Sequence, residues 1–310
     1  MKRARRTLPW LACLCALQAW LAPVGDPFRP FQAGARGLGL GGAVLSADCG
    51  AEANNDNPAT LYAERTVEFS IGSRLSGAES SPYDTWNLNA ALQVSRQVAV
   101  GLAVCSLSVG ALFINDGGAT PGLLSQWNLY SLTTACAWRG APHPRILLQL
   151  GANLHFRVSS DEGLLPLQTM EAGAGLLLTI WQYNRVAAVA GASVPLRGPT
   201  NSSLPFFRAA LTREFPIEKF LRSSLSLSAK YLGDVESAGV SAEYFLLDRL
   251  LRLSMALMGS TLTAQSELAG GLGLRVELVK NALTCHVDFG TRYAQAQWTH
   301  ALQVKLGFAL

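Results

Sequence analysis

Hydrophobic and polar residues alternate along most of the chain after residue 65. In the segment 145–158, RILLQLGANLHFRV, one alternate set includes the polar residues Gln149, Asn153 and His155, and the other set is wholly apolar. The segment 85–94, TWNLNAALQV, divides in the same way. A repeat of two residues is the period of a β-strand, whose successive side chains point to opposite faces. The pattern therefore predicts strands with an apolar environment on one face and a polar environment on the other.

Segments of this kind recur to the end of the chain. We count fourteen, which begin near Thr66, Thr85, Val98, Gln126, Arg145, Thr169, Arg185, Phe206, Leu221, Ala238, Leu250, Glu267, Ala282 and Thr299. Short turns such as WQYN alternate with longer loops such as INDGGATPGLL. This arrangement is typical of outer-membrane barrels, which close because an open sheet edge would leave backbone groups unpaired in lipid. We expect an all-β fold, a fourteen-stranded antiparallel transmembrane β-barrel over residues 66–310.

Composition favours a membrane barrel over a soluble β-sandwich. Apolar residues make up 49% of the chain and charged residues only 15%, which is low for a soluble protein. After residue 25 there is no apolar run of the roughly 18 residues that a spanning helix needs. The tryptophans beyond that point all lie near segment ends, where an aromatic girdle would place them. They are Trp86, Trp127, Trp138, Trp181 and Trp298.

The two ends of the chain carry transport signals. The cluster MKRARR and the apolar run at residues 8–22 predict a signal peptide over residues 1–25, because the run is too short to span a membrane. The last segment, ALQVKLGFAL, has an apolar face that includes Phe308 and reaches Leu310. It resembles the signal that the outer-membrane insertion machinery recognises. The predicted location is the outer membrane, with its lipid bilayer and that insertion machinery as partners.

The charge balance bears on nucleic acid binding, and the cysteine content bears on disulfides and metal sites. Without the four cations of the leader, 21 residues of each sign remain, so the charge balance gives no reason to expect nucleic acid binding. Cys49, Cys105, Cys136 and Cys285 would also remain. Their spacing is not that of a metal site, and the sequence leaves open whether they are free, buried or linked by disulfides.

A glycine motif precedes the first predicted strand. Gly37, Gly39 and Gly42 fit the pattern G-x-G-x-x-G. A dinucleotide site would need a buried strand before this motif and a helix after it, and the neighbouring sequence provides neither. The glycines suit a close approach of backbone to backbone. We therefore expect residues 26–65 to fold into the barrel lumen as a plug, although a surface leader remains an alternative.

The stretch 34–62, GARGLGLGGAVLSADCGAEANNDNPATLY, resembles the N-terminal segment of the FadL-type fatty acid transporters and of the related PorV-type outer-membrane proteins. The match to uncharacterised spirochaete members is the strongest. In this superfamily such a segment forms a hatch before a fourteen-stranded barrel. The resemblance implies hatch or gating roles for a set of residues carried over by position. They are Gly37, Gly39, Gly41, Gly42, Asn57, Pro58 and Ala59.

The resemblance implies a function as an outer-membrane channel for hydrophobic molecules such as long-chain fatty acids. One alternative is a PorV-type role, in which the barrel binds proteins during secretion or surface attachment, and another is a barrel with no ligand. Several inward-facing apolar residues are candidates for lining a ligand path. They are Leu147, Leu177, Leu232, Phe245 and Met258.

No enzyme activity, cofactor or metal site is expected. His286 and Asp288 share a polar strand face, but the sequence provides no partner nucleophile in a recognisable motif. Charged residues of both signs are predicted to face the lumen, where they would form salt bridges around the plug or a polar path for a ligand. They are Arg145, Arg157, Glu171, Arg208, Lys230, Glu243, Arg275, Glu277, His286 and Lys305.

Overall fold

The structure is a computed structural model of the chain. It describes residues 34–40, 49–62, 66–76, 83–109, 113–114, 122–123, 127–161, 168–197, 204–218, 221–232, 235–247, 250–260, 265–294 and 297–309. The predicted signal peptide, residues 1–25, lies outside these ranges. Among the described residues, no helix has the length and apolar character needed to cross a membrane.

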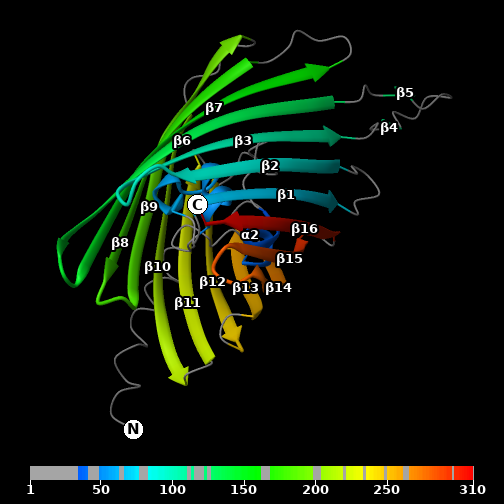
Figure 1. Ribbon diagram of the computed structural model, residues 1–310. Helices are drawn as coiled ribbons and strands as arrows, with labels where there is room; N and C mark the ends of the chain where they lie inside the picture. Colours follow the sequence, from blue (N-terminus) through cyan, green and yellow to red (C-terminus); the bar gives the residue numbers. More distant parts are fainter. Residues whose placement is uncertain are drawn as a thin grey trace.

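Antiparallel strands wrap around in a closed barrel, in which β1 pairs with β2 on one side and with β16 on the other (Figure 1). The order is β1-β16-β15-β14-β13-β12-β11-β10-β9-β8-β7-β6-β3-β2. The strands of the barrel are β1 (Val67–Ser76), β2 (Tyr83–Gln93), β3 (Val98–Val109), β6 (Trp127–His143), β7 (Ile146–Asp161), β8 (Gln168–Ile180), β9 (Asn184–Arg197), β10 (Leu204–Glu218), β11 (Leu221–Leu232), β12 (Val235–Leu246), β13 (Leu251–Ser260), β14 (Gln265–Val279), β15 (Leu283–Ala294) and β16 (Gln297–Phe308). The predicted all-β antiparallel fold is confirmed.

The two faces of the strands separate as the alternation predicts. On β7, Leu150, Leu154 and Phe156 are exposed on the outer surface, whereas Asn153 and His155 are buried inside. The same separation of faces is seen at the other predicted segments whose side chains are described, because a strand places alternate side chains on opposite faces. The tryptophans whose side chains are described are exposed near strand ends. These are Trp86, Trp138, Trp181 and Trp298.

Strand boundaries agree closely with the sequence pattern, with one addition. β3 begins at Val98 and β11 at Leu221, the residues that the alternation indicated. The stretch INDGGATPGLL, predicted to be a loop, contributes to a small two-stranded sheet of β4 (Phe113–Ile114) and β5 (Gly122–Leu123). Two residues per strand are too few for a periodic signal, so the sequence pattern missed this pairing.

The barrel has two distinct ends. At one end, which we call the short-turn end, tight turns connect β2 to β3, β6 to β7, β8 to β9 and β14 to β15. The start of β1 and the end of β16 lie at this end as well. Backbone hydrogen bonds connect neighbouring turns there, for example from Trp181 N to Arg145 O at 2.9 Å. The short-turn end is therefore a regular rim of the barrel.

Candidate functional site

The described residues before β1 pack inside the barrel. We call residues 34–40 and 49–62 the inner segment. It contains a short helix, α2 (Ala35–Gly39), and two 3₁₀ turns, η4 (Gly50–Asn54) and η5 (Pro58–Thr60). α2 lies against β13 to β16, η4 against β1 to β3, and η5 against β6 to β8 (Figure 1). The segment thus follows the inner wall across the β1–β16 seam.

The glycine run adopts a helix that the sequence analysis did not predict. Gly37 and Gly39 lie in α2, whose residues are all buried. A helix of five residues is too short to leave a periodic pattern. Gly39 lies close to the wall, because a Cβ at this position would stand 3.0 Å from Gly271 Cα. Gly41 and Gly42 lie outside the described residues.

The Asn57-Pro58-Ala59 motif forms a capped turn. Asn57 has an extended backbone, and its Oδ1 accepts a hydrogen bond from Ala59 N at 3.1 Å. Asparagine is a favoured cap, and Pro58 takes the first position of the turn, where no backbone N–H is needed. Asn57 Nδ2 also donates to Leu176 O of β8 at 3.4 Å. The motif therefore both shapes η5 and ties it to the wall.

Asn54 ties η4 to two strands. Its Nδ2 donates to Ala51 O at 2.8 Å, and to Ala90 O and Leu102 O at 3.1 Å each. In return, Asn153 Nδ2 of β7 donates to Asn54 O at 3.0 Å. Asn54 is completely buried. We call the contacts of Asn54 and Asn57 with the wall the amide anchor.

Glycines in the wall make room for the amide anchor. A Cβ at Gly151 would overlap the backbone of Pro58 and Ala59, and one at Gly175 would overlap the Asn57 side chain. Glycine is needed at such positions because any side chain would displace the backbone facing it. The absence of side chains at Gly151 on β7 and Gly175 on β8 therefore leaves the space that η5 and its Asn57 cap occupy.

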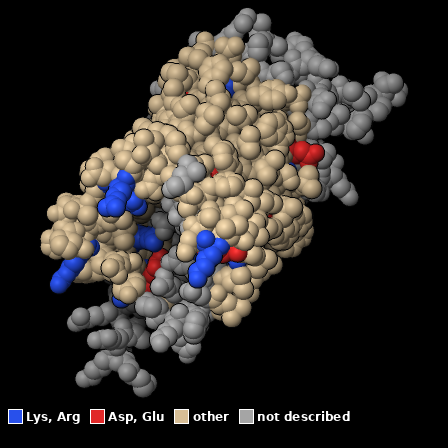
Figure 2. All heavy atoms as spheres, viewed as in Figure 1, with Lys and Arg blue, Asp and Glu red and all other residues tan. Residues whose placement is uncertain are grey.

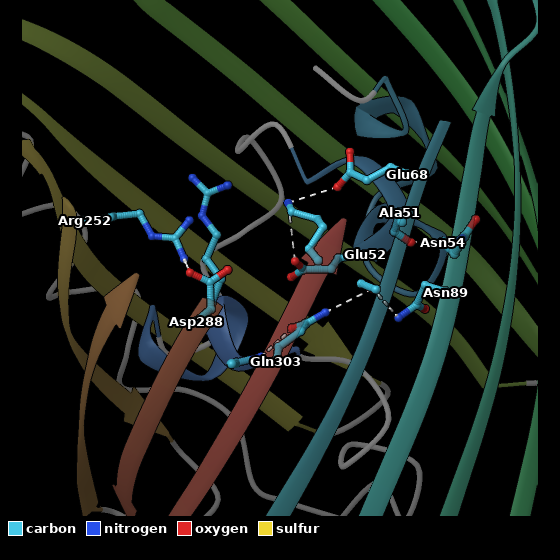
Figure 3. A network of polar contacts seen from close by, with 12 residues as sticks. Ala51, Glu52, Asn54, Glu68, Asn89, Arg252, Asp288 and Gln303 are labelled. Atoms are coloured by element: carbon cyan, nitrogen blue, oxygen red, sulfur yellow. Dashed lines mark hydrogen bonds and ion pairs between the residues drawn. The ribbon is translucent and has the colours of Figure 1, made fainter. Parts of the chain in front are cut away.

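Ion pairs hold the other end of the inner segment. Arg36 of α2 donates from Nε and Nη2 to the two carboxylate oxygens of Glu243 on β12, at 2.8 and 2.7 Å. Arg252 of β13 lies 3.3 Å from Glu243 and 2.6 Å from Asp288 of β15 (Figure 3). A two-point contact such as the one between Arg36 and Glu243 is among the strongest forms of charged hydrogen bond. We call this set, with the Lys305 contacts described next, the ionic anchor.

Lys305 of β16 lies between two carboxylates. Its Nζ is 3.6 Å from Glu52 of η4 and 3.1 Å from Glu68 of β1 (Figure 3). On the same strand, Gln303 Oε1 accepts a hydrogen bond from Ala35 N at 2.8 Å, and its Nε2 donates to Ser70 Oγ of β1 at 3.2 Å. Residues of β16 therefore bind both the inner segment and β1.

A third set of polar contacts involves Asn55 and Asp56, between the two residues of the amide anchor. Arg208 Nη2 of β10 donates to Asp56 O at 2.8 Å. Asn55 Oδ1 accepts from Thr133 Oγ1 at 3.1 Å, and Thr133 Oγ1 lies 2.7 Å from His155 Nδ1. On the wall nearby, Arg157 Nη1 donates to Glu171 Oε2 at 2.8 Å. These contacts bind the centre of the inner segment to β6 and β10.

Burial changes the ionisation of three groups in the inner segment. Burial raises the pKa of the Cys49 thiol to about 12. Burial also raises the pKa of Glu52, although Lys305 acts in the opposite direction. For Arg36, burial acts to lower the pKa, but the Glu243 carboxylate holds it above its usual value. Arg36 is therefore charged and Cys49 is a neutral thiol at neutral pH.

Gly50 has a backbone conformation that other residues rarely adopt. Its φ is +58°, and a Cβ would overlap the Glu68 carboxylate. Glycine is the residue suited to this conformation. All four cysteines in the described residues are free, and Cys49 and Cys105 are buried.

The predicted lining residues occupy different environments. Leu177 is buried in a cluster with Ala59, and Met258 is also buried. Leu147 and Phe245 are partly buried. The side chain of Leu232 lies outside the described part of the structure. Of the four whose side chains are described, Leu147 and Leu177 lie on the neighbouring strands β7 and β8, and Phe245 and Met258 lie on β12 and β13.

Half of the ten predicted lumen charges lie inside in ion pairs, in agreement with salt bridging around a plug; they are Arg157, Glu171, Arg208, Glu243 and Lys305. Arg145 and Glu277 are exposed at the short-turn end. Arg275 and His286 are partly buried, and the Lys230 side chain is not described. The sequence analysis assigned no role to Arg36, Glu52 or Asn54. A usable signal existed for Arg36 and Glu52, because they are charged residues in a stretch that contains few others.

Comparisons with known proteins agree with this architecture. No protein-family model matches the sequence, and no curated protein matches it. Many solved structures have a similar fold, and three of them illustrate the likeness. The toluene transporter TbuX of Ralstonia pickettii is 12% identical, with a TM-score of 0.57 over 88% of this chain and 97% of that one. The monoaromatic hydrocarbon channel CymD is 9% identical, with a TM-score of 0.58 over 89% and 98%.

A Pseudomonas aeruginosa FadL homologue is 8% identical, with a TM-score of 0.55 over 89% of this chain and 98% of that one. At these identities the likeness concerns the fold. The resemblance to FadL-type proteins that the N-terminal motif indicated is confirmed at that level.

Proposed function

We propose that this chain is an outer-membrane channel for hydrophobic molecules, exported by residues 1–25 and built as a fourteen-stranded transmembrane barrel. Residues 26–65 act as its hatch. The main observation behind the proposal is the inner segment, which packs against the inner wall of the barrel and is held there by the amide anchor and the ionic anchor. The apolar outer surface and the likeness to toluene and monoaromatic hydrocarbon channels support it.

The arrangement of charges favours release of α2 before the rest of the inner segment. When Arg36 leaves, Glu243 keeps Arg252 as a partner. A buried charge that loses its only partner costs about 3–5 kcal/mol, and a second partner reduces this cost. The wall can therefore let α2 go without leaving Glu243 unpaired. In the proposed mechanism a hydrophobic molecule enters the barrel, the hatch shifts, and the molecule leaves through the wall or toward the periplasm.

A disulfide between α2 and the wall tests this mechanism. A Cβ at Gly39 would lie 2.9 Å from Ser254 Oγ of β13, so Gly39→Cys with Ser254→Cys places two sulfur atoms within bonding reach. We expect liposomes that contain the oxidised double variant to lose uptake of a labelled hydrophobic molecule, and uptake to return after reduction. Each single cysteine variant, oxidised in the same way, is the control. Uptake that is unaffected by the disulfide would contradict the role of α2 as a moving part.

The ligand class needs a separate measurement. The sequence resemblance implies long-chain fatty acids, whereas TbuX and CymD are described as toluene and monoaromatic hydrocarbon channels. Saturable binding of labelled oleate and of labelled toluene to the refolded chain would be compared. Binding of either one supports the channel and selects the class. If neither binds, and stoichiometric protein partners co-purify instead, the PorV-type alternative replaces the channel.

A further inference from the structure

Basic side chains gather at the short-turn end of the barrel. Arg96, Arg145 and Lys280 lie in three different turns, and Arg213 lies near the end of β10. All four side chains are exposed. Figure 2, in the same view as Figure 1, shows Lys and Arg side chains around the barrel mouth at this end. We call these four residues the cationic collar.

Among the described side chains at this end, exposed acids are fewer than the collar cations. The exposed carboxylate is Glu277, which accepts a hydrogen bond from Asn281 N at 2.6 Å. Glu214 is partly buried and pairs with Arg185 at 3.1 Å. At the opposite end, the exposed charged side chain in the described part of the barrel is Asp84. Among the described side chains, the two ends therefore differ in the sign of their exposed charge.

Exposed aromatic side chains mark where the apolar outer surface ends, close to the collar. Trp138, Trp181 and Tyr183 are all exposed near the short-turn end. Tryptophan and tyrosine in barrels mark the boundary between hydrocarbon and headgroups. The collar residues Arg145 and Arg96 lie in turns beyond these aromatic side chains, where the membrane placement proposed above puts the lipid phosphates.

Arg213 shows how a collar cation reaches this level. It lies on the outer face of β10 between Leu211 and Phe215, both of which are exposed. Its guanidinium carbon lies 5.1 Å from the centre of the Phe215 ring. An arginine in this position covers apolar surface with its stem and keeps its charge in the headgroup layer. An outward-facing cation here has lipid, rather than the barrel lumen, as its neighbour.

We propose that the cationic collar binds the phosphates of anionic phospholipids in the leaflet at the short-turn end. The collar thereby fixes the depth of this rim in the membrane. Guanidinium and ammonium groups form charge-assisted hydrogen bonds with phosphate oxygens, and basic residues beside an acidic leaflet are attracted to it. The inference rests on the membrane placement proposed above.

Quenching of single tryptophans by brominated lipids tests the collar. Two full-length variants would be made, one retaining only Trp181 at the short-turn end and one retaining only Trp298 at the other end. Each would be refolded into vesicles of phosphatidylcholine that contain either brominated phosphatidylglycerol or brominated phosphatidylcholine. We expect an approximately fivefold preference for phosphatidylglycerol at Trp181, the factor that one cation near an acidic surface supplies, and none at Trp298.

Substitutions separate the possible outcomes. Replacing Arg96, Arg145, Arg213 and Lys280 with glutamine should abolish the preference at Trp181, whereas Gln97→Ala, an exposed and uncharged position in the same rim, should preserve it. Equal quenching by both lipids at Trp181, or a preference that survives the four substitutions, would overturn the collar. Absence of quenching by either lipid at both tryptophans would instead refute the membrane placement itself.

Discussion

The two anchors of the inner segment differ in how replaceable their contacts are. In the amide anchor, Asn54 and Asn57 bind wall carbonyl groups, and Gly151 leaves room for the backbone of η5. In the ionic anchor, each wall charge that holds the inner segment has a second partner on the wall. The amide anchor depends on shape, whereas the ionic anchor can exchange partners. We infer that the first is fixed and the second is made to be released.

Cys49 provides a common readout for this comparison. It is buried in the inner segment, and burial raises the pKa of its thiol to about 12, so it should react slowly with maleimides while the segment stays in place. In a chain whose other cysteines are replaced by serine, the labelling rate of Cys49 reports how often the segment leaves the wall.

The largest effect is expected in the amide anchor, from Asn54→Asp. The substitution places carboxylate oxygens against Ala51 O, Ala90 O and Leu102 O, where an amide donated. An uncompensated buried charge costs about 3–5 kcal/mol, so Cys49 labelling should accelerate by more than about a hundredfold. Asn281→Asp is the control for the change of charge, because Asn281 lies in an exposed turn outside the inner segment. Similar rates for the two variants would refute the special role of Asn54.

A smaller effect is expected from Gly151→Ala. The added methyl group would overlap the backbone of Pro58 and Ala59, and overpacking of this kind typically costs about 1–3 kcal/mol. Labelling of Cys49 should therefore accelerate about tenfold. Gly270→Ala serves as the control, since its nearest contact would be an ordinary 3.6 Å from Ser254 O. If both alanine variants label at the same rate, the fit between η5 and β7 is not what holds the segment.

The smallest effect is expected in the ionic anchor, from Glu52→Gln. Burial raises the pKa of Glu52 in the folded state, so its contribution to docking is greatest at low pH and is lost as the pH rises through the raised value. Glutamine removes this dependence, and Lys305 keeps Glu68 at 3.1 Å. The ratio of Cys49 labelling rates, parent over variant, should thus increase from about pH 4.5 upward. A ratio that does not change with pH would contradict this assignment.

The sequence predicts the barrel better than it predicts the anchors. Strand positions such as Val98 and Leu221 could be read because a two-residue period repeats over many residues, and one face is uniformly apolar. The anchors join residues far apart in the chain, such as Arg36 and Glu243, and no local pattern encodes such a pair. The Asn57-Pro58-Ala59 turn could be predicted because its capping chemistry is local.

The Lys305 and Gln303 contacts have a consequence for assembly of the barrel. The seam between the first and last strands pairs Ser70 with Lys305 and Gly72 with Gln303. A shift of one residue in this seam would turn both side chains toward lipid and away from Glu52 and Ala35. The observed register of the closing seam is therefore the one in which β16 makes its contacts with the inner segment, so the inner segment and the seam stabilise each other.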